Sequence, residues 1–283
     1  MERNISIALI LTIVAIALGF FSYRSLFSNE NYPYTEIISN VPLYSKIPIE
    51  DLHKWKKTAV FKTDNKAGIT CNFEISAISS PSVDGNRIEI KKGKEGIYIR
   101  EKSAVISGSD DIEILNACHV FSCLLANVSC HENFLEIKNL IPYENKMNIV
   151  VDEKLSQNGV KAYSEILAAY GFIQAGIVDI DKDRKFSEYE KAINKVFIYP
   201  YVKNGDNCTR QKFKNLIQET EGNITLQCEE IDSGIFIQYS NETKIEVRED
   251  KIYILGNDDR IQKAAIIVRD IIAPDWIRTL YGM

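Results

Sequence analysis

The sequence contains few residues that interrupt regular backbone structure and few that catalyse reactions at neutral pH. Its 283 residues include 7 Pro, 14 Gly and 3 His. So little Pro and Gly excludes a fibrous or low-complexity chain, and three scattered histidines nominate no general base. Motifs for a nucleophile elbow, a phosphate loop or an H-E-x-x-H zinc helix do not occur. The formal net charge of −5 has the wrong sign for a nucleic-acid-binding domain, so we expect no nucleic-acid partner.

Charge is also missing from one long stretch near the start of the chain. Ile5 to Tyr23 is a run of 19 residues without Asp, Glu, Lys or Arg, and as a helix it spans roughly 28 Å, close to the thickness of a bilayer core. The only A-x-A, at Ala15–Ala17, lies inside this run, so we do not expect cleavage as a secretory signal. We predict a transmembrane anchor at residues 1–24, with the lipid bilayer as partner, and a stalk at residues 25–55. A buried core helix is the alternative.

All six cysteines lie beyond this anchor. An even number confined to one side of a membrane indicates disulfides, and therefore an extracytoplasmic compartment for the C-terminal domain. Six cysteines allow 15 pairings, of which we favour Cys71–Cys118, Cys123–Cys130 and Cys208–Cys228. The alternative is a zinc site, because five potential ligands lie within 14 residues: Cys118, His119, Cys123, Cys130 and His131.

Four glycosylation sequons of the form N-x-S/T also follow the anchor, at Asn127, Asn207, Asn223 and Asn241. Such sites are modified only on the external side of a membrane. They favour the same topology, in which the protein spans the cell membrane once and displays its C-terminal domain outside.

An internal duplication organises the rest of the chain. Ile97–Asp111 aligns without gaps on Ile245–Asp259, and the shared residues include an Arg-Glu pair, a Gly and a terminal Asp-Asp. Each copy has the pattern strand, turn, strand, helix. We therefore predict an α+β fold with two related antiparallel sheet-and-helix lobes at residues 56–145 and 195–283, joined by an αβ segment at residues 146–194.

The acidic pairs of the duplicated unit precede its helices. Asp110, Asp111, Asp258 and Asp259 are predicted to cap the helix N-termini, where carboxylates accept from free amides and suit the helix dipole. The alternative is a catalytic or metal-binding pair of carboxylates. Other patterns predict strands at residues 69–75, 147–152, 196–201 and 224–231 and helices at residues 158–171 and 209–220.

One segment between the copies carries the residue types of a calcium loop. Its oxygen ligands would be Asp179, Asp181, Asp183, the Lys185 carbonyl, Ser187 and Glu190. This segment resembles the twelve-residue loop of EF-hand and dockerin-like proteins, which implies Ca²⁺ as a cofactor. Arg184 replaces the usual Gly at a cost of about 1 kcal/mol, so weak binding near millimolar calcium is expected. A solvated acidic turn is the alternative.

These observations predict a membrane-anchored extracytoplasmic protein of the cell envelope that binds or scaffolds. An envelope protein or a surface ligand would be its partner. Two alternatives stay open. One is an anchored extracytoplasmic hydrolase that uses paired carboxylates, and the other is an accessory subunit of a larger membrane complex.

Overall fold

The computed structural model describes residues 32–55, 60–63, 86–131, 133–140, 146–174, 197–210 and 224–272. The chain divides into two compact units, Met1–Pro33 and Tyr34–Met283, and every described helix and strand belongs to the second unit. Among these described residues, no helix has the length and apolar character needed to cross a bilayer. The predicted anchor at Ile5–Tyr23 lies outside the described residues and stays a prediction.

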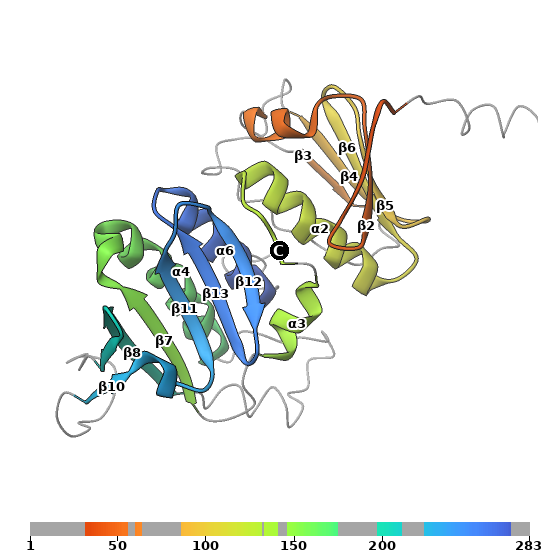
Figure 1. Cartoon of the computed structure of the whole chain (residues 1–283). Helices are drawn as coiled ribbons and strands as arrows, with labels where there is room; N and C mark the ends of the chain where they lie inside the picture. Colours follow the sequence, from red (N-terminus) through yellow and green to blue (C-terminus); the bar gives the residue numbers. More distant parts are fainter. Residues whose placement is uncertain are drawn as a thin grey trace, which may run out of the picture. The chain divides into compact units, whose positions relative to one another are not determined.

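The Tyr34–Met283 unit contains two mixed sheets, and the first has the strand order β1-β2-β5-β6-β4-β3 (Figure 1). Helix α2 packs against this sheet and η1 packs against α2. Their apolar side chains form one core that includes Leu43, Ile97, Ile106 and Phe121, all fully buried. We call this set of elements the first lobe. Its bounds are β1 Tyr34–Ile38, β2 Val41–Ser45, η1 Ile49–Lys54, β3 Val60–Thr63, β4 Arg87–Lys92, β5 Gly96–Ile99, β6 Ser103–Gly108 and α2 Asp111–Ala126.

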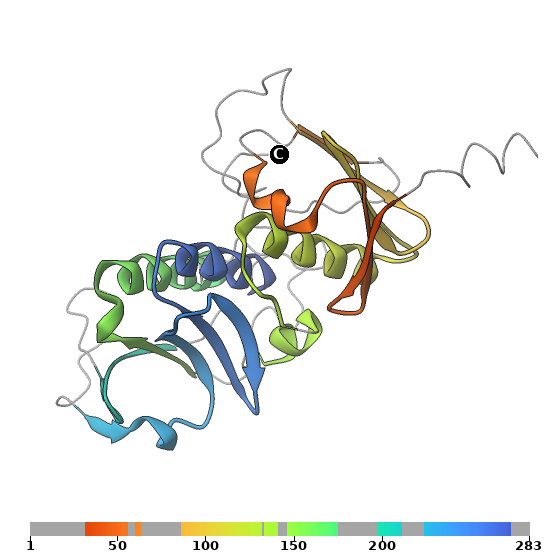
Figure 2. The same ribbon diagram turned by 45° about the horizontal axis from the view of Figure 1, so that its top comes forward.

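The second sheet has the strand order β10-β9-β8-β7-β11-β13-β12. Helices α4 and α6 lie side by side and cover one face of it (Figure 2). We call this set the second lobe. Its bounds are α3 Phe134–Asn139, β7 Lys146–Asp152, η2 Glu153–Leu155, α4 Ser156–Gln174, β8 Phe197–Asn204, β9 Asn207–Arg210, β10 Thr225–Gln227, η3 Cys228–Glu230, β11 Gly234–Tyr239, β12 Lys244–Arg248, β13 Lys251–Gly256 and α6 Arg260–Ile272.

The duplicated unit occurs in both lobes and is larger than the aligned sequence. The hairpin β5–β6 corresponds to β12–β13, with Ile97 opposite Ile106 in one copy and Ile245 opposite Ile254 in the other. A parallel strand follows on the far side, β4 beside β6 and β11 beside β13. The next strand is again parallel, β3 beside β4 and β7 beside β11. The order β3-β4-β6-β5 is therefore repeated as β7-β11-β13-β12.

The second copy differs from the first by a long insertion between β7 and β11. In the first lobe, β3 and β4 are the corresponding neighbours. In the second lobe, η2, α4, β8, β9, β10 and η3 all lie between them in the sequence. The predicted calcium loop and the cysteines at 208 and 228 fall within this insertion, so they are features of one copy only.

The antiparallel arrangement that we expected is wrong for three of the five described strand pairings in the first sheet and for three of the six in the second. Strands β3, β4 and β6 run parallel, and so do β8, β7, β11 and β13. Alternation of apolar and polar residues identifies a strand but carries no information on its direction. Parallel neighbours require crossover connections, and α4 is part of one, between β7 and β8.

Two of the predicted boundaries are also wrong. Residues 34–54, which were expected in the stalk, form β1, β2 and η1, and β2 pairs with β5 inside the first sheet. Residues 146–174 were expected in a connecting segment, but β7 is an interior strand of the second sheet and α4 packs against α6. Asn40 lies in the turn between β1 and β2, and Pro48 is the N-cap of η1; residues of these types are as common in such turns and helix starts as in a tether.

The remaining element predictions have mixed outcomes. The strand at 147–152, the helix at 158–171 and the strand at 196–201 correspond to β7, α4 and β8. The helix expected from Thr209 is wrong at its start, because Thr209 lies in β9. In the predicted strand at 224–231, only Thr225–Gln227 is extended before η3 begins. The strand predicted at residues 69–75 lies outside the described residues.

The face of the second sheet opposite α4 and α6 carries a smaller apolar cluster of Val150, Tyr201, Cys208, Ile231 and Phe236. Cations lie over aromatic rings on this face. The distances to the ring centroids are 3.9 Å for Arg210 over Tyr199, 5.0 Å for Arg248 over Tyr253 and 5.5 Å for Lys251 over Phe236. Such pairs contribute about 0.5–1 kcal/mol each when exposed, and the long cationic side chains shield apolar ring surface from water.

Candidate functional site

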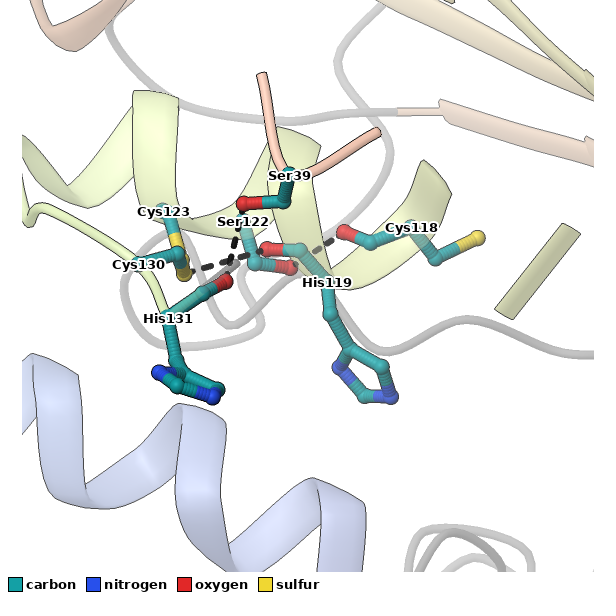
Figure 3. Close-up of a disulfide and its surroundings, with 7 residues drawn as sticks. All are labelled: Ser39, Cys118, His119, Ser122, Cys123, Cys130 and His131. Carbon is teal, nitrogen blue, oxygen red and sulfur yellow. Dashed lines mark hydrogen bonds between the residues drawn. A yellow bond between two sulfur atoms is a disulfide. The ribbon is translucent and has the colours of Figure 1, made fainter. Parts of the chain in front are cut away.

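The five residues of the zinc alternative, Cys118, His119, Cys123, Cys130 and His131, lie on helix α2 and on the segment that follows it, where the first copy of the repeat ends (Figure 3). Helix α2 carries His119 and Cys123 and ends before Asn127, which adopts a left-handed conformation with φ of 53°. This residue reverses the chain, so that Cys130 returns to Cys123 and forms a disulfide with a Cα–Cα distance of 5.9 Å. The Cys130 sulfur also lies 3.9 Å from the His119 carbonyl oxygen. The disulfide ties the chain after α2 to the last turns of that helix.

The chain that follows this reversal covers the outer edge of β12. The Ser129 amide donates to the Thr243 carbonyl at 3.0 Å, and the Ile245 amide donates to the Ser129 carbonyl at 2.8 Å. The segment Ser129–His131 therefore extends the second sheet by one short parallel bridge, Ser129 to Lys244. In the first sheet the corresponding edge, that of β5, is covered by the whole strand β2.

His131 joins three segments at this junction. Its carbonyl oxygen accepts from Ser39 Oγ in the β1–β2 turn at 2.8 Å. Its ring Nδ1 accepts from the Val247 amide of β12 at 3.3 Å, and its Nε2 lies 2.5 Å from Glu136 Oε2 on α3. The side chain is only 16% exposed, so these polar contacts satisfy a ring that water scarcely reaches.

A small cavity lies beside His119 of α2 and His131 of the segment Ser129–His131, which we call the covering segment. Its lining comes from α2, α3, β12, α6 and the covering segment and consists of Asn116, His119, Val120, Cys130, His131, Phe134, Ile137, Ile245, Ile267 and Ile271. Its volume is about 10 Å³, which is room for roughly one water molecule. The Asn116 Oδ1 atom is buried without a hydrogen-bond partner among the described residues. Among the described residues, this cavity therefore has room for about one water molecule and not for an organic substrate.

The disulfides agree with two of the three predicted pairs. Cys123–Cys130 and Cys208–Cys228 are both present, the second with a Cα–Cα distance of 5.0 Å between β9 and η3. Cys118 is also disulfide-bonded, but its predicted partner Cys71 lies outside the described residues, so that pairing stays a prediction. The zinc alternative is wrong in its thiolate ligands, because Cys123 and Cys130 are bonded to each other.

In the first acidic pair, Asp110 has the capping role that we predicted, and Asp111 does not. Asp110 is the N-cap of α2, and its Oδ1 accepts from the Glu113 amide at 2.9 Å. Glu113 Oε2 accepts from the Ser109 amide at 2.7 Å and from the Ser109 hydroxyl at 2.9 Å, so it binds the residue before the N-cap. Burial, followed by the charges of Glu113 and Asp110, raises the pKa of the nearby Glu95 carboxyl. Asp111 is exposed and pairs with Lys92 at 3.1 Å.

The second acidic pair caps α6 in a different way. Asp258 Oδ1 accepts from the Arg260 amide at 3.0 Å, and Oδ2 accepts from Arg260 Nε at 2.8 Å. The side-chain hydrogen bond from Arg260 lowers the pKa of the Asp258 carboxyl. Asp259 is exposed. Asp110 therefore accepts from an amide of α2 and Asp258 from an amide of α6. These contacts do not bring the carboxylates of the two copies together.

A buried ion-pair network between α4 and α6 was not predicted from the sequence. Arg269 is 3% exposed, and its Nη1 donates to Glu165 Oε2 at 2.5 Å while its Nε donates to Asp270 Oδ1 at 3.1 Å. Gln262 Nε2 donates to the other oxygen of Glu165 at 2.8 Å. A signal was available, because Arg269 lies four positions after Ala265 on the apolar stripe of α6.

The other predicted site residues are placed in part. Asn127, Asn207 and Asn241 are exposed, and Asn223 lies outside the described residues. Asn207 Oδ1 accepts from Gln227 Nε2 at 2.9 Å. Glycosylation of these residues stays a prediction. All six predicted calcium ligands, Asp179, Asp181, Asp183, Lys185, Ser187 and Glu190, lie outside the described residues.

Comparison of the chain with protein-family models, with curated proteins and with solved structures found no match. Its function is therefore inferred from its own residues.

Proposed function

We propose that this protein is a membrane-anchored, extracytoplasmic component of the cell envelope and that its two lobes act in binding or scaffolding. The observation that carries this proposal is the state of the cysteines. Cys118, Cys123, Cys130, Cys208 and Cys228 are all disulfide-bonded. Disulfides persist in oxidising compartments and are rare in the cytosol. The uncharged run at Ile5–Tyr23 supplies the means of attachment.

Binding or scaffolding is favoured over hydrolysis by what the candidate catalytic groups do. Asp110 and Asp258 accept from amides at the starts of α2 and α6. A carboxylate oxygen that accepts from a helix amide stabilises that helix, and the lone pair it uses is no longer available to accept a proton from a substrate. His131 has both ring nitrogens engaged, by Val247 and Glu136. The contacts of Asp110 and Asp258 give structural roles to two of the four carboxylates on which the hydrolase alternative rests.

The compartment is tested by counting thiols and by labelling intact cells. We expect the full chain, denatured without reductant, to show no reactive thiol, and all six after reduction. A membrane-impermeant lysine reagent should label the protein on intact cells, and the protein should stay with the membranes after alkaline washing. A chain that begins at residue 30 is the control and should be released. Six reactive thiols before reduction, or labelling only after lysis, would contradict the proposal.

We also propose that residues 179–190 bind Ca²⁺, on the strength of their resemblance to an EF-hand loop. Isothermal titration with calcium should give saturable heat at about millimolar concentration. The heat should disappear when Asp179 and Glu190 are both replaced by Ala. A matched control replaces Asp206 and Glu229, two exposed acidic residues of the same insertion, and should leave the heat unchanged. Absence of heat from the unaltered chain would reduce the segment to a polar turn.

A further inference from the structure

The protonation state of His131 is determined by its two ring contacts. A backbone amide is only a donor, so Nδ1 must offer a lone pair to Val247. An ionised carboxylate is only an acceptor, so Nε2 must carry the proton that faces Glu136. The two contacts together fit the tautomer with its hydrogen on Nε2 and its lone pair on Nδ1. Protonation would place a second N–H on Nδ1, where it would point at the Val247 N–H.

We infer that His131 is a pH-responsive clasp that holds the covering segment Ser129–His131 on the edge of β12. When the ring is neutral, it binds Val247 and Glu136 together. When the ring is protonated, it keeps the attraction to Glu136 and releases Val247, because two donors cannot share a hydrogen bond. Acidification therefore breaks the Val247 contact and weakens the hold of the covering segment on β12 at this point, while the Ser129 backbone bonds and the Cys123–Cys130 disulfide remain.

Few other charged groups face this ring. Glu136 approaches from α3, and His119 lines the same cavity from α2. The β12 side chains Lys244, Glu246 and Arg248 alternate with the cavity residue Ile245 and so lie on the other face of the sheet. The cavity residues from α6 are Ile267 and Ile271, which carry no charge. Glu136, which contacts the ring, and His119, which lines the same cavity, are thus the titratable side chains beside His131 among the described residues.

Comparison of the two copies shows why the Val247 amide depends on a side chain. In the first sheet, β2 pairs with β5 at Leu43–Ile97, Tyr44–Tyr98 and Ser45–Ile99. In the second sheet, one bridge at Ser129–Lys244 is supplemented by the side chain of His131. A titratable side chain thus replaces a backbone hydrogen bond of the first copy. An uncovered strand edge presents unpaired amides and carbonyls to any further strand.

Amide hydrogen exchange on the full chain tests the clasp at the Val247 amide. After correction for the intrinsic effect of pH, protection of Val247 should fall roughly 3- to 10-fold between about pH 8 and about pH 5. The Ile254 amide in β13 serves as reference and should stay protected. His131→Asn keeps an acceptor close to the position of Nδ1 and should remove the pH dependence. His53→Asn, at an exposed histidine, should retain it.

Equal protection of Val247 at both pH values, or a fall that persists in the His131→Asn variant, would overturn the inference. A second measurement covers the case in which this variant does not fold. Nitrogen NMR of the unaltered protein near pH 8 should show His131 with its hydrogen on Nε2. A hydrogen on Nδ1 at that pH would also overturn the inference.

Discussion

Replacement of Arg269 by Met is expected to destabilise the fold by about 3–5 kcal/mol, because it removes the cation from a buried ion-pair network. The guanidinium is almost inaccessible; its bond to Glu165 links helix α6 to helix α4, and it also binds Asp270, the next residue of α6. Met retains most of the apolar stem and avoids a large cavity. The loss therefore comes from removing the guanidinium that binds both the Glu165 and the Asp270 carboxylates in a site that is largely shielded from water.

Urea unfolding of the full chain measures this cost. A double-mutant cycle with Glu165→Leu should show that the paired change costs less than the sum of the single changes, with a coupling of about 0.5–3 kcal/mol. Arg260→Met on the same helix is the control, since its ion pair with Asp258 is 31% and 40% exposed on its two side chains. That change should cost no more than about 1 kcal/mol. Equal losses for Arg269 and Arg260, or strict additivity in the cycle, would refute the reasoning.

Three further predictions concern the first lobe and the insertion. Because the pKa of Glu95 is raised, its contribution favours the fold below the ordinary pKa of a glutamate and is lost as pH rises through the folded-state value. Glu95→Gln should therefore raise the melting temperature near about pH 8 and leave it unchanged near about pH 3; a shift of equal size at both would contradict this. Gly108→Ala places a Cβ 2.7 Å from the Glu113 Cβ and should cost about 1–3 kcal/mol in urea unfolding, whereas Gly93→Ala, with its nearest contact at 3.9 Å, should cost less. Replacing both Cys208 and Cys228 by Ser opens a 20-residue separation and should cost about 3 kcal/mol by chain entropy, as calorimetry would show.

Sequence reasoning succeeded where the structure depends on neighbours in the chain. The cap at Asp110 needs an amide three residues away, and the Cys123–Cys130 bond closes a short reversal after α2. The strand–turn–strand–helix unit was visible because its periods change from two to about 3.6 within one short segment. The second copy of the unit shows the same pattern, so the prediction rested on two occurrences of it.

Sequence reasoning failed where contacts join distant segments. Strand direction depends on where the chain crosses the sheet, and the apolar alternation of β4 or β11 is the same in either direction. The contacts of His131 with Ser39 and Val247 span 92 and 116 residues. No local pattern distinguishes such a histidine from an exposed one. Arg269 was missed for the same reason, since its partner Glu165 lies 104 residues away.

The sequence by itself determined the duplicated unit, the helix caps and the expectation of an oxidised, anchored protein. These follow from local periodicity, from hydrogen bonds within a few residues and from the number and placement of cysteines. Only the tertiary structure decided that the sheets are mixed, that residues 34–54 belong to the first lobe and that His131 covers an edge of the second. The physical reason is that a strand gains its hydrogen bonds from whichever neighbour packing brings to it, and that choice is made across the whole chain.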